Sequence, residues 1–261
     1  MSYRFIKFET VEDHIAIITL NRPERLNALN GPLLDELLSA IRAIEDDTDI
    51  RVFLLTGAPR PDGRPCFSAG VDLKAAAEGI KMDPHLGPTV TNDIDDMLKP
   101  SIAVVDGVCS TGAVELALSC DLRLVGQAAQ ISDWHLKNLG TGLGGWGAST
   151  RWSRLVGAAA TKEIVLTGKV VDGDEAFRIG FATRLYPSER LWDEALAMAR
   201  TIAAMRPEGV ALTLAHLDHN MDMSRDQSLR WAELARKWLG VTSNLAEAGR
   251  QLAGRKRDKG R

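Results

Sequence analysis

Two short segments of small residues are the parts of this sequence whose types and spacing best suit chemistry. They are residues 68–73 (SAGVDL) and residues 106–113 (DGVCSTGA), and each lies between a predicted strand and a predicted helix. Each is therefore expected to present backbone N–H groups that have no partner within the helix and carry the positive end of its dipole. Such groups attract a phosphate or a developing oxyanion, and glycine lets the ligand approach the backbone closely.

Local sequence leaves the ligand of these two segments open. The phosphate-binding pattern G-x-x-x-x-G-K-[ST] is absent, and residues 140–145 contain G-x-G without the strand–turn–helix context of a dinucleotide site. No G-x-S-x-G nucleophile elbow and no H-E-x-x-H zinc motif occurs. On spacing alone, both glycine turns could also be no more than tight connections between elements.

The elements that must position these segments alternate between strand and helix. Residues 5–9 and 15–20 predict a hairpin, and the apolar spacing from residue 32 onward predicts a helix. Residues 79–90 read as a Gly/Pro loop before a helix near 90–98, and the chain after about residue 158 is mostly helical. Further strands are predicted at 51–56, 102–105 and 122–125, and a buried helix at 111–119. This order favours an α/β fold.

Composition excludes several classes of protein. The chain has 261 residues, 45% of them hydrophobic, and a net charge of −3, so nothing global favours nucleic acid. The basic end, residues 255–261, is typical of a solvated terminus. Cys66, Cys109 and Cys120 are expected to be free thiols without a metal. No signal peptide or membrane span is recognisable, so we expect a cytoplasmic protein without a membrane partner.

Taken together, these segments resemble the crotonase (enoyl-CoA hydratase/isomerase) superfamily over about residues 5–180 and more weakly beyond. Residues 21–23 (NRP) followed by 26–29 (LNAL) are similar to the CoA-binding opening of that family. Residues 67–73 are similar to its first oxyanion segment, and residues 99–107 to its second strand and turn. Other similar segments are Cys120-Asp121, residues 154–157, Thr167-Gly168 and Glu175-Ala176.

The resemblance implies a spiral of repeated ββα units followed by a C-terminal helical region used for trimerisation. We therefore expect an acyl-CoA-binding core over residues 1–195, a helical region over residues 196–261, and a homotrimer or homohexamer. By position, the oxyanion donors are the N–H groups of Val71 and Gly112, although Thr111-Gly112-Ala113 replaces the usual glycine run. The residues expected to contact the substrate or its CoA are Asn27, Ala28, Ser68, Ala69, Gly70, Asp72, Leu73, Lys74 and Trp134.

The resemblance also implies a pair of catalytic glutamates, of which only one is present. Glu115 lies three residues after Gly112, inside a predicted apolar helix. Burial of its carboxylate is costly unless the carboxylate has hydrogen-bond or charged partners. No glutamate occurs in the segment after Gln130 where the second should fall. An alignment without gaps from Gln130 puts His135 at the position of the second glutamate. An alignment shifted by one residue puts Trp134 there, and one shifted by two puts Asp133 there. His135 could carry a proton near neutrality and Asp133 could act as a base, or either could serve only loop hydrogen bonding.

The expected activity is therefore that of an acyl-CoA enzyme that stabilises a thioester enolate, most simply an enoyl-CoA hydratase, a lyase of fatty acid metabolism. No cofactor is expected, because coenzyme A enters as part of the substrate. The missing glutamate leaves isomerisation, ring chemistry, hydrolysis of a cyclic acyl-CoA, and thioester binding without hydration as alternatives. Three tryptophans could line a flat pocket for a cyclic or aromatic acyl group, or pack in the ordinary way: Trp134, Trp146 and Trp152.

Overall fold

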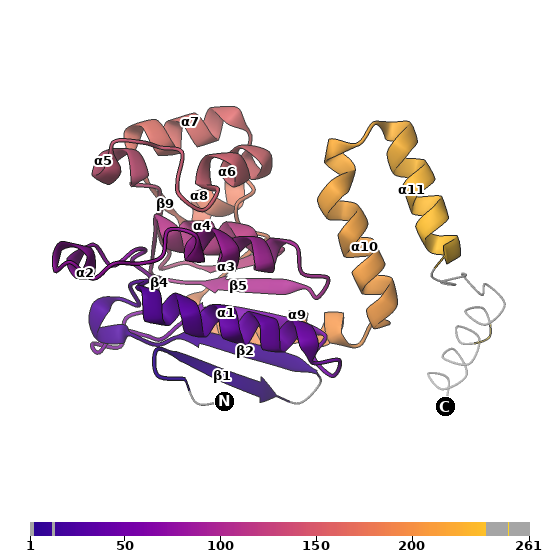
Figure 1. Ribbon diagram of the computed structural model, residues 1–261, viewed down its shortest axis with the longest axis horizontal. Helices are drawn as coiled ribbons and strands as arrows, with labels where there is room; N and C mark the ends of the chain where they lie inside the picture. The colour runs from indigo at the N-terminus through magenta and orange to yellow at the C-terminus, as the bar shows by residue number, and fades with distance from the viewer. Residues whose placement is uncertain (1–2, 12–13, 239–249, 251–261) are drawn as a thin grey trace. The chain divides into compact units, whose positions relative to one another are not determined.

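The computed structural model describes residues 3–11, 14–238 and 250, and it divides into two compact units, Met1–Met205 and Arg206–Arg261. The first unit continues past the predicted boundary at residue 195, because helix α9 (Ser188–Ala203) packs on the central sheet. The basic end at residues 255–261 lies outside the described residues. The first unit contains both glycine segments, which lie beside β4 (Cys66–Ser68), α2 (Leu73–Ala77) and α4 (Gly112–Ser119) (Figure 1).

The central sheet of the first unit has six strands in the order β1-β2-β3-β5-β7-β10. The predicted N-terminal hairpin is confirmed, since β1 and β2 pair antiparallel from Ile6↔Leu20 to Val11↔Ile15. All other neighbours in this sheet run parallel. The strands are β1 (Ile6–Val11), β2 (Ile15–Leu20), β3 (Val52–Gly57), β5 (Ser101–Val105), β7 (Leu122–Gly126) and β10 (Arg184–Tyr186).

A second sheet of four short strands lies beside the first, in the order β4-β6-β8-β9. These strands are β4 (Cys66–Ser68), β6 (Val108–Ser110), β8 (Gln130–Ser132) and β9 (Val170–Asp172). Strands β4, β6 and β8 pair in parallel, and each follows a long strand and precedes a helix. The helices after them are α2 (Leu73–Ala77), α4 (Gly112–Ser119) and α5 (His135–Leu139). The predicted spiral of ββα units is confirmed, and both glycine segments lie where a short strand ends.

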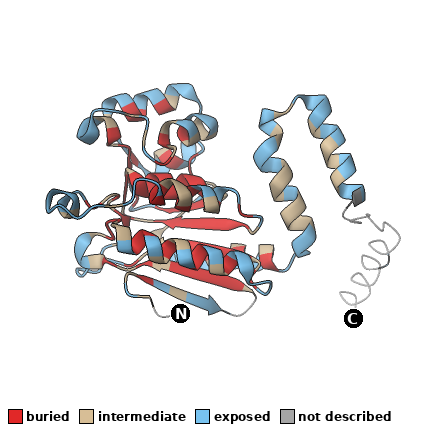
Figure 2. Ribbon diagram, viewed as in Figure 1, coloured by how far each residue is buried: buried red, intermediate tan, exposed pale blue. Residues whose placement is uncertain are grey.

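Helices cover both faces of the six-stranded sheet and bury its inner strands β2, β3, β5 and β7, whereas the edge strands β1 and β10 are largely exposed or half-buried (Figures 1 and 2). On one face, alternate residues such as Ile18, Phe53 and Ala103 belong to a core shared with helix α1 (Gly31–Asp46). On the other face, Ile17, Leu54 and their neighbours pack with α9. Full burial of each such side chain stabilises the fold by roughly 1.5–3 kcal/mol. The predicted helix from residue 32 is confirmed, and the Asn30 side chain caps it by accepting from the Leu33 N–H at 3.1 Å.

The helix predicted near residues 90–98 begins earlier than expected. Helix α3 spans Leu86–Asp95 and includes Gly87 and Pro88, which the sequence suggested were loop. Proline is tolerated in the first turn of a helix because its missing N–H would have no partner there. The apolar positions Leu86, Val90 and Ile94 are buried on one face. The remaining helices of this unit are α6 (Ala148–Val156), α7 (Ala158–Thr167) and α8 (Gly173–Arg178).

The second unit consists of helical segments over its described residues. Helix α10 (Pro207–His219) is followed by the short helix η2 (Asn220–Asp222) and by helix α11 (Arg225–Trp238). The His216 ring stacks on Trp231 with centroids 5.2 Å apart, and its Nε2 lies 3.0 Å from the Ser228 hydroxyl. None of the helices that the structure describes is long and apolar enough to cross a membrane.

The first unit also yields a stability prediction at Asn27, which is fully buried with φ = 52°. Its Nδ2 donates to the carbonyls of Ala58, Cys66 and Phe67 at 2.8, 3.1 and 3.2 Å, and its Oδ1 accepts from the Arg22 N–H at 3.0 Å. An Asn27→Ala substitution leaves several buried groups unpaired, so we expect the free energy of unfolding to fall by about 2–4 kcal/mol.

Urea unfolding followed by circular dichroism measures this loss. The matched control is Asn138→Ala, at an exposed position in α5, which should change stability by less than about 0.5 kcal/mol. Equal losses in the two variants would show that the Asn27 amide does not hold these segments together.

Candidate active site

The two glycine segments come into direct contact at the ends of β4 and β6. Gly70 has φ = 84°, and a Cβ there would lie 2.1 Å from the Thr111 hydroxyl and 3.2 Å from the Gly112 nitrogen. A Cβ at Gly112 would lie 3.3 Å from Val71 Cγ2. Parallel strands end at the same edge of a sheet, which brings together segments some 40 residues apart in sequence. Glycine is required at Gly70 by both its backbone conformation and this close approach.

Val71 and Gly112 both have backbone N–H groups that the fold leaves available. Among the backbone hydrogen bonds between described residues, neither N–H donates to a carbonyl. Gly112 is the first residue of α4, so its N–H has no partner within the helix. Leu29 donates to the Gly70 carbonyl and accepts from the Asp72 N–H, so the Val71 N–H points away from Leu29. The two residues whose N–H groups the sequence predicted as donors therefore lie in contact with each other.

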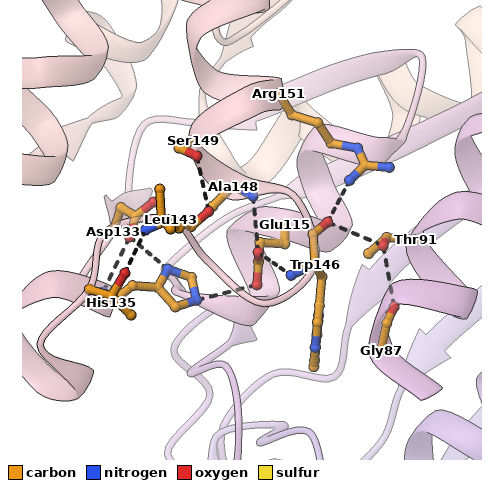
Figure 3. Close-up of polar contacts among 11 residues, drawn as sticks. Gly87, Thr91, Glu115, Asp133, His135, Leu143, Trp146, Ala148, Ser149 and Arg151 are labelled. Carbon is orange, nitrogen blue, oxygen red and sulfur yellow. Dashed lines mark hydrogen bonds and ion pairs between the residues drawn. The ribbon is translucent and has the colours of Figure 1, made fainter. Parts of the chain in front are cut away.

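Glu115 lies one turn into α4 and is only 1% exposed. Its Oε1 accepts from the backbone N–H groups of Trp146 and Ala148 at 2.7 and 3.0 Å (Figure 3). Its Oε2 lies 3.3 Å from His135 Nε2. Gly144 has φ = 75°, and a Cβ there would come 2.5 Å from Glu115 Oε1, so the glycine-rich loop packs directly on this carboxylate. The loop thus satisfies a buried charge that would otherwise be costly.

Of the three residues that the sequence left open, His135 is the one whose side chain faces Glu115. Its Nδ1 lies 2.7 Å from Asp133 Oδ1, and its backbone N–H also donates to that oxygen at 3.2 Å. Asp133 therefore lies behind the imidazole, on the side away from Glu115. Asp133 Oδ2 is buried and has no hydrogen-bond partner among the described residues. Trp134 turns elsewhere, since its indole N–H donates to the Gly168 carbonyl at 2.8 Å.

The two carboxylates determine the charge of His135. Burial of the imidazole by itself lowers its pKa, but the hydrogen bonds and negative charges of Asp133 and Glu115 outweigh this effect. Together they raise the pKa of His135 to about 9. The ring is then an imidazolium at neutral pH, held between two carboxylates in a line from α4 to the start of α5.

Several residues that the sequence assigned to ligand contact have side chains that support the first glycine segment. Asn27 and Ser68 are fully buried, and the Ser68 hydroxyl donates to the Asn27 carbonyl at 2.8 Å and accepts from the Gly70 N–H at 3.1 Å. Asp72 caps α2 through the Ala75 N–H at 3.0 Å. These side chains can act on a ligand only by holding the backbone in place.

The remaining predicted contact residues differ in exposure. Ala28 is buried, Ala69 and Trp134 are partly exposed, and Leu73 and Lys74 are exposed beside the first glycine segment. Asp72 is also paired with a cation, because its Oδ2 lies 3.0 Å from Arg22 Nη1. Within this set, a ligand can therefore reach Leu73 and Lys74 directly, and Ala69 and Trp134 in part.

The glycine-rich loop contributes groups that the sequence did not single out. The N–H groups of Trp146 and Ala148 bind Glu115. Because they belong to the backbone, no residue type in the sequence marks them as binding groups. The predicted tryptophan-lined pocket is not formed by Trp152, which is fully buried and packs on Phe181 with centroids 5.0 Å apart. The three cysteines are free and buried, in agreement with the sequence.

The charge on His135 predicts how stability depends on pH. Its pKa in the folded protein, about 9, lies above the ordinary value of 6.5. The stabilisation is therefore complete below about pH 6.5 and is lost as the pH rises through 9. We expect the free energy of unfolding to fall by up to about 3 kcal/mol across this window. Urea titrations at a series of pH values measure it, and a His135→Gln variant that shows the same fall would contradict the assignment.

Comparison with known proteins identifies the family. Residues 10–247 match the family model described as enoyl-CoA hydratase/isomerase. The short-chain-enoyl-CoA hydratase of Clostridium acetobutylicum is 32% identical over 84% of this chain and 83% of its own, and the crotonyl-CoA hydratase of Syntrophomonas wolfei is 32% identical over 88% and 87%. The crystal structure of an enoyl-CoA hydratase from Bacillus anthracis superposes with a TM-score of 0.88 at 26% identity over 97% of both chains. This chain belongs to the enoyl-CoA hydratase/isomerase family.

Proposed function

We propose that this protein adds water across the double bond of a 2-enoyl-CoA. The observation that carries the proposal is the contact of Glu115 Oε2 with His135 Nε2 at 3.3 Å. Glu115 lies three residues after Gly112, whose backbone N–H donates to no carbonyl among the described residues. In this proposal Glu115 is the base, His135 is the acid, and the N–H groups of Val71 and Gly112 are the oxyanion donors. Two relatives that are named as hydratases, and that this chain matches over most of their length, support the same activity.

The thioester oxygen is stabilised by two backbone N–H groups in this proposal. The carbonyl lies between the donors of Val71 and Gly112, and negative charge develops on its oxygen as the nucleophile adds. Each donor is fixed before the reaction, so no reorganisation is needed when the charge appears. Loss of one such donor raises the barrier by roughly 3–4 kcal/mol in comparable acyl chemistry.

Glu115 and His135 handle the protons of the added water. The Glu115 carboxylate takes a proton from the water while the water oxygen bonds to C3 of the enoyl group. The electron pair of the C2=C3 bond moves toward the thioester oxygen and forms an enolate. The enolate then takes a proton at C2 from the His135 imidazolium, and the proton held on Glu115 passes to the neutral imidazole. One water is added in total, and both side chains return to their starting states.

Asp133 acts as a positioning residue for His135. Its Oδ1 accepts from both the backbone N–H and the Nδ1 of that residue, which fixes the ring plane and directs Nε2 at Glu115.

Coenzyme A enters as part of the substrate, with Ala69, Leu73 and Lys74 available beside the first glycine segment. The cytoplasmic location, the role in fatty acid metabolism and the homotrimer or homohexamer stay predictions.

The base assignment predicts a large loss of activity in Glu115→Gln. This variant keeps the shape of the side chain but removes the group that accepts the proton, so kcat for hydration of crotonyl-CoA should fall by about 10²- to 10⁴-fold. Absorbance of the conjugated thioester follows the reaction, and mass spectrometry of the product distinguishes gain of one water from isomerisation.

The matched control for this experiment is Glu189→Gln, at an exposed position at the start of α9, which should react like the wild type. Undiminished hydration by Glu115→Gln would remove Glu115 as the base. A wild-type protein that binds crotonyl-CoA without changing its mass would instead support thioester binding without hydration.

The positioning role of Asp133 predicts a shifted pH profile. Asp133→Asn removes a negative charge from beside Nδ1, so the pKa of His135 should fall from about 9 toward its ordinary range. Since the charged ring is the acid, the alkaline fall in kcat/KM should begin at a lower pH in this variant than in the wild type. Asp93→Asn, which alters only an outlying ion pair with Arg42, serves as the control. An unchanged alkaline limb in Asp133→Asn would show that His135 is not the titrating acid.

A further inference from the structure

Trp146 lies in the site and has a side chain that the proposed reaction does not use. Its backbone is bound on both sides (Figure 3). The N–H donates to Glu115 Oε1 at 2.7 Å, and the carbonyl accepts from the buried Thr91 hydroxyl at 3.3 Å and from Arg151 Nη1. Arg151 is held in turn by Asp95, with Nη2 and Oδ2 3.0 Å apart. The backbone of Trp146 is therefore fixed to α3, α4 and α6 at once.

The indole of Trp146 lies across glycines from two different helices. A Cβ at Gly87 in α3 would come 2.0 Å from indole Cε2 and 2.1 Å from Nε1. A Cβ at Gly112, at the start of α4, would come 2.9 Å from Cζ3 and 3.1 Å from Cη2. Any larger residue at Gly87 would overlap the ring. The ring thus spans the space from α3 to the N-terminus of α4, and the side chain is only 7% exposed.

The benzene edge of this ring lies next to the reacting end of the site. Gly112 carries one proposed oxyanion donor, and the Trp146 N–H binds the proposed base Glu115. An acyl group whose thioester carbonyl lies at Gly112 must therefore extend past the ring or stop at it. A ring that is 7% exposed offers little face on which a flat acyl group could stack. It fills space instead, since a tryptophan buries about 150–250 Å², comparable to several methylene groups.

We propose that Trp146 closes the far end of the acyl pocket and restricts the substrate to short 2-enoyl groups. This inference rests on the proposed function, because Gly112 and Glu115 locate the reacting carbons. It assigns a specificity-determining role to one residue of the glycine-rich loop. It also selects a short acyl group over the cyclic or aromatic group that three tryptophans could have lined.

Binding of saturated acyl-CoAs tests this role without depending on hydration. Butyryl-CoA and decanoyl-CoA have no double bond, so calorimetric dissociation constants report only how well each acyl group fits. The variant Trp146→Leu opens space beside Gly112, and each methylene that becomes buried there strengthens binding of the longer chain. We expect the ratio of the decanoyl-CoA to the butyryl-CoA dissociation constant to fall at least about tenfold relative to the wild type.

Trp192→Leu is the matched control, because this tryptophan lies on α9 and is 37% exposed. Its ratio should equal that of the wild type. Thermal unfolding verifies that each variant is folded, and Trp146→Phe, which leaves a smaller cavity, replaces Trp146→Leu if the latter does not fold.

The inference is overturned if the wild type binds decanoyl-CoA as tightly as butyryl-CoA, or if the ratio in the Trp146 variant matches that of the control. A shifted ratio in a protein whose wild type hydrates no enoyl-CoA would uphold the pocket boundary while removing the proposed reaction. A wild type that hydrates crotonyl-CoA but shows no shift on substitution would do the reverse. The two proposals therefore fail separately.

Discussion

The parallel pairing of β4, β6 and β8 is the constraint on which the rest of the site depends. Ser68 pairs with Cys109, and Ser110 pairs with Ser132, so the three strands end at one edge of the small sheet. The segments that follow contain Val71, Gly112 and His135, which are widely separated in sequence. Because parallel strands present their carboxyl ends at the same edge, one pairing register brings all three segments together. A slip of one residue would turn every side chain of the slipped strand to the opposite face.

The site also depends on a row of three buried charged side chains, and the glycine-rich loop offsets part of the cost of burying them. Glu115, His135 and Asp133 lie in line, with a cationic ring between two carboxylates. Ion pairs removed from water are stable only when their remaining hydrogen-bonding capacity is met. The N–H groups of Trp146 and Ala148 meet it at Glu115, and Gly144 provides the close approach that this needs. The glycine-rich loop is thus as much a part of the acid–base site as the charged residues.

The same loop would link the proposed chemistry to the proposed boundary of the acyl pocket. Trp146 binds Glu115 through its backbone and reaches toward Gly112 with its ring. Glycine at Gly87 and Gly112 leaves the space that this ring occupies. If both proposals hold, reactivity and specificity share one segment, and a change in the loop is expected to alter both. In this chain the His135 imidazolium faces Glu115 from the segment in which the resemblance implied a second glutamate, and Asp133 and Glu115 favour its charged form.

The sequence by itself determined the α/β class, the hairpin, helix α1, the two glycine segments and the family, because these follow from local periodicity, turn residues and short motifs. It also indicated Glu115, since a carboxylate inside an apolar helix is conspicuous. Only the tertiary structure decided that His135 faces Glu115 while Trp134 and Asp133 do not. The tertiary structure also decided that α3 begins at Leu86 and that Trp146, unlike Trp152, reaches the site. The physical reason is that these contacts join distant segments, so they depend on strand register and helix phase, which no local pattern specifies.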